Sequence, residues 1–320
     1  MDENKNNRNR KTTGMAVIEQ HITDQYAIYN GDCCEVLQSF PDDSMHLAVF
    51  SPPFADLYCY SDSVKDLGNC ETYEDFLFHF GFVVRELRRV LKPGRICAVH
   101  CMDIPAMLER DGYIGIKDFS GDLIRLFGDA GFIYHSRHLI WKDPLIEATR
   151  TKAIGLMHKQ LCKDSCKSRS GLPDYLLGFR VPGENAEPVV HPEGLTEYAG
   201  KNDPGGDGVK RSHNIWRAYA SPVWMDIRQT RTLDARKGRD PEDEKHLCPL
   251  QLDTIFRAIA LWSNPGENVL TPFMGVGSEV YGAVVNGRRG VGIELKESYY
   301  RQAVANLEAA VQSGVEGTLF

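Results

Sequence analysis

Residues 268–279 read Asn-Val-Leu-Thr-Pro-Phe-Met-Gly-Val-Gly-Ser-Glu, and they are the part of the sequence that most narrowly defines the fold. Their apolar beginning predicts a short buried strand, and Gly275 and Gly277 predict a loop that opens a helix. The next predicted strand, 289–294, ends on the acid Glu294. This combination is typical of a nucleotide-type site, because glycines let the backbone approach a ligand closely and the acid can bind both ribose hydroxyls. A glycine loop that only packs closely is the alternative interpretation.

The same alternation of strands and helices extends outward from this stretch. Strands are predicted at 26–29, 46–50, 95–100 and 132–141, and helices at 33–40, 73–91, 119–130, 250–263 and 298–310. This order predicts an α/β fold with a mostly parallel sheet and helices on both faces. After Asp143-Pro144 the alternation fades into a polar region that extends to about Lys245, which we interpret as an insertion or a second lobe.

A second loop, Ser51-Pro52-Pro53-Phe54, ends the strand predicted at 46–50, and ligands bind at the carboxyl ends of strands in open α/β sheets. Consecutive prolines fix φ twice and remove two N–H donors, so the Ser51 hydroxyl and the Pro52 carbonyl are left as acceptors. Two acceptors that bind the hydrogens of an exocyclic amino group would help that group pyramidalise and free its lone pair. Phe54 would stack on an extruded base. A rigid strand-ending turn is the alternative.

Composition and charge limit the partners. The 320 residues are 42% hydrophobic and 25% charged, which suits an ordinary globular protein with one large core or a core plus a smaller lobe. A formal net charge of −7 does not indicate nucleic-acid binding, so a DNA site must be a local basic patch. Two basic clusters offer one, with a solvated charged face as the alternative for each. Their candidate DNA-binding residues are Arg150, Lys152, Lys159, Arg169, Arg228 and Arg231.

The sequence predicts a cytoplasmic protein without a metal. No stretch approaches the roughly 18 to 20 uninterrupted apolar residues of a membrane span, and residues 1–14 are polar. Nine cysteines scattered through predicted strands and helices favour a reducing compartment. His158, Cys162 and Cys166 share one helical face, but a fourth ligand is missing and thiols are common in cores, so we expect no zinc.

Taken together, the loops at 51–54 and 272–277 resemble those of the DNA amino-methyltransferases, whose sheet binds S-adenosyl-L-methionine at one loop and the target base at the other. The resemblance spans about residues 26–308. Because the catalytic loop precedes the cofactor loop, with the polar region between them, the chain resembles the circularly permuted β group. The resemblance implies a Rossmann-like methyltransferase, bacterial or phage-encoded, with S-adenosyl-L-methionine as its cofactor.

The resemblance also implies roles for individual residues. The catalytic loop would be Ser51, Pro52, Pro53 and Phe54, and the cofactor-binding residues would be Asp32, Pro249, Thr271, Phe273, Gly275, Gly277 and Glu294. Glu294 would hold the ribose, Asp32 would contact the adenine, and Phe273 and the glycines would line the methionine part. Pro249 lies in the segment that closes over the cofactor. Thr271 departs from the pattern, because this position usually carries Asp, and we expect a weakened polar contact with binding retained.

The target base is left between two alternatives. Enzymes of this kind rotate the target nucleotide out of the duplex and need no covalent intermediate, so positioning carries the catalysis. No Pro-Cys pair of the cytosine-carbon enzymes occurs, since Cys248 precedes Pro249. A Ser-headed loop is the usual sign of N4-cytosine enzymes. However, the segments 56–70, 100–102, 141–144 and 180–185 resemble adenine methyltransferases of Mu-like prophages, and we favour N6-adenine slightly over N4-cytosine.

The resemblance divides the chain into a disordered tail (1–20), a catalytic half (21–144), a target-recognition insertion (145–245) and a cofactor-binding half (246–320). Tyr175, Trp216 and Trp224 could stack on bases, although core packing is the preferred interpretation for each. We expect DNA as the partner, no membrane association and no obligate protein partner, and leave a homodimer open. We also expect a lone protective enzyme without a partner nuclease.

Three other functions stay open at this point. A related Asn-Pro-Pro-Tyr loop serves protein side-chain amides, so a protein methyltransferase is one rival, although the permuted order and the long insertion argue against it. An RNA amino-methyltransferase is the second. The third is an inactive DNA-binding module, for which a damaged catalytic loop would be the sign, whereas residues 51–54 are intact.

Overall fold

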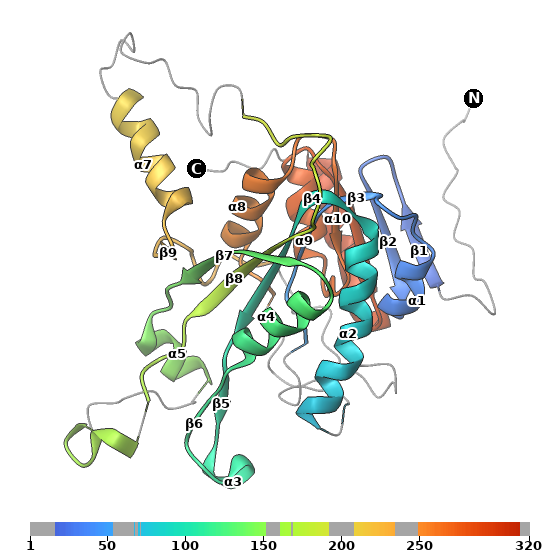
Figure 1. The fold of residues 1–320 in the computed structure, drawn as a ribbon. Coiled ribbons are helices and arrows are strands. Elements are labelled where there is room, and N and C mark those ends of the chain that lie inside the picture. Colours follow the sequence, from blue (N-terminus) through green and yellow to red (C-terminus); the bar gives the residue numbers. More distant parts are fainter. Residues whose placement is uncertain are drawn as a thin grey trace, which may run out of the picture.

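The computed structural model describes residues 17–53, 67, 70, 72–151, 161–167, 169–191, 208–233 and 249–313. Nine strands among these residues form one sheet, in the order β1-β2-β11-β10-β3-β4-β8-β7-β9 (Figure 1). They are β1 (Val17–Ile22), β2 (Tyr26–Gly31), β3 (Met45–Phe50), β4 (Leu91–Met102), β7 (Ile133–Ile140), β8 (Asp174–Arg180), β9 (Val223–Trp224), β10 (Asn268–Thr271) and β11 (Arg289–Glu294). A hairpin of β5 (Ile104–Ala106) and β6 (Gly115–Lys117), with α3 (Leu108–Asp111) between its strands, follows β4.

The centre of the sheet is parallel, as the sequence predicts. Parallel pairing joins β2, β11, β10, β3 and β4, whereas β1 is antiparallel to β2, and β8 is antiparallel to both β4 and β7. The chain proceeds from β3 to β4 on one side and from β10 to β11 on the other. The strand order therefore reverses between the neighbours β10 and β3. Ligands of open α/β sheets bind at such a reversal, beyond the carboxyl ends of the strands.

Helices cover both faces of the sheet (Figure 1). One face carries α1 (Cys33–Gln38), α2 (Tyr73–Val90) and α4 (Phe119–Asp129), and the other carries α8 (Leu252–Trp262), α9 (Ser278–Val285) and α10 (Glu297–Ser313). This double cover explains why the central strands are continuous apolar runs in the sequence. Within the described ranges no helix combines the length and the apolar character needed to cross a membrane.

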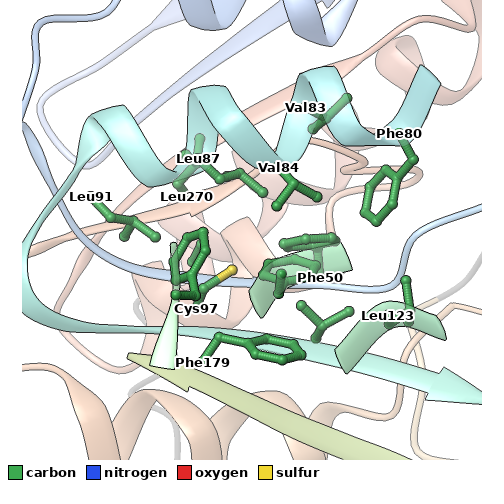
Figure 2. Packing of buried hydrophobic residues seen from close by; sticks show 14 of the residues in the cluster. Phe50, Phe80, Val83, Val84, Leu87, Leu91, Cys97, Leu123, Phe179 and Leu270 are labelled. Carbon is green, nitrogen blue, oxygen red and sulfur yellow. The ribbon is translucent and has the colours of Figure 1, made fainter. Parts of the chain in front are cut away.

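Helix α2 shows how apolar spacing in the sequence becomes core packing. Phe80, Val84 and Leu87 recur at helical spacing, and all three are fully buried. They point from one side of the helix toward the sheet, where Phe50 at the end of β3 lies among them (Figure 2). Burial of a large apolar side chain of this kind contributes about 1.5–3 kcal/mol to stability. The helix begins after Thr72, whose hydroxyl accepts a hydrogen bond from the first turn.

The predicted disordered tail, 1–20, is wrong in its last residues. Val17–Ile22 forms β1, an edge strand that pairs antiparallel with β2. Its sequence, Val-Ile-Glu-Gln-His-Ile, does not alternate apolar and polar residues, and none of its side chains is fully buried. The segment therefore lacks the pattern that marks a strand in a sequence. Residues 1–16 lie outside the described residues.

The polar region at 145–245 is not separate from the sheet over its whole length. It contributes β8, which lies between β4 and β7 and has five of its seven residues buried, and β9 at the edge. An antiparallel strand needs no crossover helix, so β8 escapes a search for strand and helix alternation. The other described elements of this region are α5 (Pro144–Thr151), a 3-10 turn (Ser165–Lys167) and α7 (Gly208–Ala220). In Figure 1, α5 and α7 lie at the β7–β9 side of the sheet.

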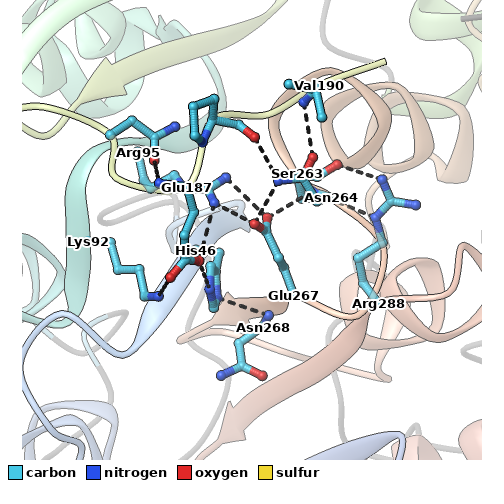
Figure 3. A network of polar contacts seen from close by, with 12 residues as sticks. His46, Lys92, Arg95, Glu187, Val190, Ser263, Asn264, Glu267, Asn268 and Arg288 are labelled. Atoms are coloured by element: carbon cyan, nitrogen blue, oxygen red, sulfur yellow. Dashed lines mark hydrogen bonds and ion pairs between the residues drawn. The ribbon is translucent and has the colours of Figure 1, made fainter. Parts of the chain in front are cut away.

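A polar network joins the amino ends of the central strands, at the opposite edge of the sheet from their carboxyl ends (Figure 3). Arg95, which is 1% exposed, forms a two-pronged ion pair with Glu267. Glu187 binds Lys92 at 2.7 Å and His46 at 3.1 Å. His46, Glu187 and Glu267 lie close enough to be considered as metal ligands. Because Arg95 and Lys92 already neutralise the two carboxylates, we interpret the network as structural.

Candidate active site

Four neighbouring strands bring the predicted site residues to one edge of the sheet. Asp32 follows β2, Glu294 ends β11, Thr271 ends β10, and Ser51 follows β3. These strands are parallel and adjacent in that order, so their carboxyl ends lie side by side. Residues 51–53 therefore lie directly beside the glycine loop, on the far side from Asp32.

The glycine loop has the backbone geometry that its sequence predicts. Gly275 and Gly277 have φ values of 54° and 92°, in the left-handed region that favours glycine. A Cβ atom at Gly277 would lie 3.2 Å from the Cβ of Ala303 in α10, whereas one at Gly275 would meet nothing within 4 Å. Gly277 thus serves close packing, and Gly275 borders open space through which a ligand can approach the backbone.

The Glu294 carboxylate is fixed at the end of β11 by backbone donors. One oxygen accepts a hydrogen bond from the Gly275 N–H at 2.7 Å, and the other accepts one from the Lys296 N–H at 2.8 Å. The side-chain amide of Asn30 in β2 donates to the Glu294 carbonyl at 2.8 Å. The acid is held between the two loops that follow β10 and β11, which fits the role of a ribose ligand.

Two polar groups are buried beside this loop. The Thr271 hydroxyl is buried and has no hydrogen-bond partner among the described residues. Glu279 lies in the first turn of α9 and is 4% exposed. Burial, together with the nearby charge of Glu294, raises the pKa of Glu279 to about 8. The carboxyl group is therefore largely protonated at neutral pH.

The other predicted cofactor residues occupy defined places. Asp32 caps α1 by accepting a hydrogen bond from the Glu35 N–H at 3.0 Å. Pro249 is half-buried just before α8. Phe273 is also half-buried, and its ring centre lies 5.8 Å from that of Phe50 and 6.1 Å from that of Phe80. Its ring therefore also packs against the core under α2 and joins the glycine loop to the end of β3.

The predicted catalytic loop is described as far as Pro53. Ser51 and Pro53 are half-buried and Pro52 is buried, whereas Phe54 lies outside the described residues. The Ser51 hydroxyl forms a 2.7 Å hydrogen bond with Nδ1 of His100, near the end of the adjacent strand β4. The residue types at 51–53 predict this loop, but they do not predict its partner.

Three buried residues behind Ser51 escape the sequence-based site prediction. Nε2 of His100 lies 3.3 Å from a carboxylate oxygen of Asp174, without the alignment of a hydrogen bond. The other oxygen of Asp174 accepts from Lys142 Nζ at 2.6 Å. Burial alone would raise the pKa of Asp174, but Lys142 and His100 outweigh it and hold the pKa at about 2. Charged residues at the ends of buried strands are the signal that could have indicated them.

Of the six candidate DNA-binding residues, the structure describes the side chains of Arg169, Arg228 and Arg231. Arg228 and Arg231 both bind Asp253 at the start of α8, at 2.7 and 2.6 Å. The Arg228 side chain is 62% exposed, and the Arg231 guanidinium lies over the Phe256 ring. Burial lowers the pKa of Arg169, which is half-buried. The Arg150 side chain, Lys152 and Lys159 lie outside the described residues.

The aromatic candidates divide into two kinds. Trp224 is 1% exposed and stacks on His138, and Tyr175 is half-buried beneath the Arg137 guanidinium. The core interpretation is wrong for Trp216, which is 65% exposed on α7. Of the residues considered for zinc, Cys162 and Cys166 are exposed free thiols, and His158 lies outside the described residues.

With this geometry established, comparison with known proteins identifies the family. The N6_N4_Mtase family model, described as DNA methylase, matches residues 45–305. The chain belongs to this family of DNA methylases. The family consists of enzymes that use S-adenosyl-L-methionine, and the open space beside Gly275 together with the acid at 294 fits such a cofactor.

Two of three relatives match most of the chain, and the third matches a shorter part. The type II methyltransferase M.BamHI of Bacillus amyloliquefaciens is 24% identical over 278 residues, which cover 85% of this chain and 55% of that protein. The chain thus spans about half the length of M.BamHI. M.MjaI of Methanocaldococcus jannaschii is 23% identical over 301 residues, 87% of this chain and 89% of that protein. M.PvuII of Proteus hauseri is 39% identical over 131 residues, 39% of this chain and 34% of that protein.

Solved structures share the fold of this DNA methylase. TTHA0409 of Thermus thermophilus, in complex with S-adenosyl-L-methionine, superposes with a TM-score of 0.61 and 24% identity over 91% of this chain and 95% of that chain. The PvuII DNA methyltransferase, described as cytosine-N4-specific, superposes with a TM-score of 0.56 and 16% identity over 92% and 94%. These likenesses confirm the predicted methyltransferase fold with its mostly parallel sheet.

Proposed function

We propose that this protein transfers a methyl group from S-adenosyl-L-methionine to the exocyclic amino nitrogen of a DNA base. The observation that carries the proposal is the contact between the end of β3 and the glycine loop at the strand-order reversal. Phe50, which precedes Ser51, and Phe273, which precedes the glycines, have ring centres 5.8 Å apart. A cofactor on the glycine loop and a base on the serine loop would therefore be immediate neighbours.

The residues of the chain act by binding and orienting the reactants. Glu294 would hold the ribose, Asp32 the adenine, and the backbone at Gly275 the methionine part of the cofactor. When bound, the cofactor supplies an electrophilic methyl group on sulfur. The Ser51 hydroxyl and the Pro52 carbonyl would bind the amino group, so that its lone pair faces the methyl carbon. Such orientation lowers the barrier because the reactants are held in a near-attack arrangement.

For the target base, N6 of adenine is our first choice. The segments 100–102 and 141–144, which resemble prophage adenine methyltransferases, supply His100 and Lys142 to the group of residues behind Ser51. The resemblance therefore includes residues that lie behind Ser51 and is not limited to residues on the surface far from it. The segment 56–70, which carries the same resemblance, falls mostly outside the described residues.

N4 of cytosine is the second candidate, and two observations favour it. The loop begins with serine, the usual residue of the N4-cytosine enzymes. In addition, 131 residues are 39% identical to M.PvuII, and a PvuII methyltransferase is described as cytosine-N4-specific. The two bases present their amino groups on rings of different size, so a direct product analysis separates them.

The experiment is incubation of the purified protein with unmethylated DNA and isotope-labelled S-adenosyl-L-methionine, followed by digestion to nucleosides and mass spectrometry. N6-methyladenine would support the first choice, and N4-methylcytosine would support the second. The Ser51→Ala variant is the control for a contaminating activity and should give little of either product. If the wild-type protein labels neither base, RNA and protein amides become the substrates to examine.

For DNA recognition we propose the part of residues 145–245 that lies outside β8 and β9. Support comes from its basic residues and from Trp216, which is exposed on α7. Arg228 and Arg231 each form an ion pair with Asp253, so they would have to bind a phosphate while they keep this contact. Action as a lone modification enzyme remains part of the proposal, and a nuclease cleaving the same unmethylated sequence would contradict it.

A further inference from the structure

We infer that His100 accepts, through Ser51, the proton that the target amino group releases, and that Asp174 and Lys142 hold His100 ready to do so. This inference rests on the proposed function, since it concerns the same reaction. His100 is a positioning residue in this scheme, because it acts only through the Ser51 hydroxyl.

The four residues form a continuous chain from the loop into the core. Ser51 Oγ lies 2.7 Å from His100 Nδ1, His100 Nε2 lies 3.3 Å from Asp174, and Asp174 lies 2.6 Å from Lys142 Nζ. They come from four different elements: the loop after β3, then β4, β8 and the segment after β7. Contacts between strands, and not one local turn, therefore hold the arrangement.

Burial gives these contacts their strength. His100 is 7% exposed, Asp174 is 5% exposed and Lys142 is 9% exposed, so water screens their charges little. Glu147 of α5 also faces Lys142, at 3.7 Å. Among the described residues, the Asp174 carboxylate thus faces the His100 ring, and Lys142 and Glu147 lie behind that carboxylate.

The charges favour one tautomer of His100. An ionised Asp174 beside Nε2 favours the proton on that nitrogen, which leaves Nδ1 as the acceptor for the Ser51 hydroxyl. Lys142 keeps Asp174 ionised in its buried position. The same carboxylate would stabilise the imidazolium that forms when Nδ1 takes up a second proton.

The step balances without any further reactant. The lone pair of the amino nitrogen forms the new bond to the methyl carbon, and the electrons of the broken carbon–sulfur bond stay on sulfur. One amino proton passes to Ser51 Oγ while the Ser51 hydroxyl proton passes to His100 Nδ1. The products are a methylated amino group, a neutral thioether and an imidazolium, which then loses its proton to water.

His100→Asn is the informative variant, because an amide can keep a hydrogen bond to Ser51 but cannot take up a proton. We expect the single-turnover rate of methyl transfer to fall about 10²-fold, within the usual range for loss of a proton acceptor. The wild-type rate should decrease at acid pH, and this decrease should be absent in His100→Asn. Cofactor affinity should stay unchanged. His79→Asn, at an exposed position of α2, is the matched control and should behave as wild type.

A double-mutant cycle separates action through Ser51 from a general structural effect. In the Ser51→Ala background, His100→Asn should change the rate less than about twofold, because the link is already broken. An equal loss in both backgrounds, or a wild-type rate for His100→Asn, would overturn the inference. If His100→Asn does not fold, the pH profile of Ser51→Ala decides, since a persisting decrease at acid pH contradicts a link through Ser51. A wild-type protein that methylates no DNA would instead overturn the proposed function as well.

Discussion

Ser51 and His100 are joined by a 2.7 Å hydrogen bond although 49 residues separate them in the chain. The reason is the register of two parallel strands, in which Phe50 of β3 lies opposite Val99 of β4. Each of the two polar residues is the next residue along its strand, so they meet at the same level of the sheet edge. The apolar core that fixes this register also fixes the geometry of Ser51.

Gly275 and Gly277 of the glycine loop should respond differently to substitution by alanine. Both have positive φ, which costs an L-residue about 1–2 kcal/mol. Gly277→Ala also places a methyl group against Ala303, so its melting temperature should fall more than that of Gly275→Ala. Gly275→Ala places its methyl group in open space and should instead lower cofactor affinity about tenfold, or about 1.4 kcal/mol. Thermal unfolding and titration calorimetry measure the two effects, and equal responses at both positions would contradict the assignment.

Glu279 should make stability depend on pH. Its pKa is raised to about 8 in the folded protein, so between about pH 4.5 and 8 the folded state binds more protons than the unfolded state. Stability therefore falls as the pH rises through this window, with a slope that approaches about 1.4 kcal/mol per pH unit for one group. Glu279→Gln should remove this contribution and raise the melting temperature at pH 8 but not at pH 4. A variant less stable than wild type at pH 8 would show that the carboxyl group has another role.

The ion pair of Arg95 and Glu267 should matter for folding and not for chemistry. Arg95→Met leaves a buried carboxylate without its partner and should cost about 3–5 kcal/mol in the free energy of unfolding. Arg95→Met combined with Glu267→Gln should recover much of this loss, because no uncompensated charge remains. Denaturant unfolding measures both variants. At a temperature where the double variant is folded, its rate of methyl transfer should match that of wild type.

Arg228 tests the proposed DNA surface. Arg228→Ala should weaken DNA binding and reduce the slope of log affinity against log salt concentration by about 1, as expected for the loss of one phosphate contact. Arg301→Ala removes another exposed arginine paired with an acid, on α10, and serves as the matched control. An unchanged salt slope for Arg228→Ala would mean that this arginine only fastens the start of α8 through Asp253.

The elements that sequence could predict are those whose signals are local. The strand at 289–294 and the helix beginning at Tyr73 match the structure, because continuous apolar runs and helical spacing are read from neighbouring residues. β8 was not predicted, since its place between β4 and β7 depends on pairing with distant segments. The same holds for Asp174, which becomes part of the site only because β8 pairs with β4.

The residues of the candidate site also divide into those that local sequence predicts and those that only the structure brings together. Ser51, Gly275 and Glu294 are marked by the residues beside them, so motif and position suffice to find them. Lys142 follows β7 and His100 lies in β4, and nothing beside either of them in the chain indicates their common partner, Asp174. A network assembled by strand register is visible only once the register is known.

The pairing of β3 with β10 has a consequence for the synthesis of this protein. At the start of this strand pair, the Asn268 N–H donates a hydrogen bond to His46, which lies 222 positions earlier in the chain. Contacts of such long range form late in folding, since a large loop must close before they contribute. A growing chain on the ribosome can order β3, α2 and β4 early, but it lacks β10 and β11 until residues 268–294 have been made. The nascent protein therefore cannot assemble the candidate site until Glu294 has emerged.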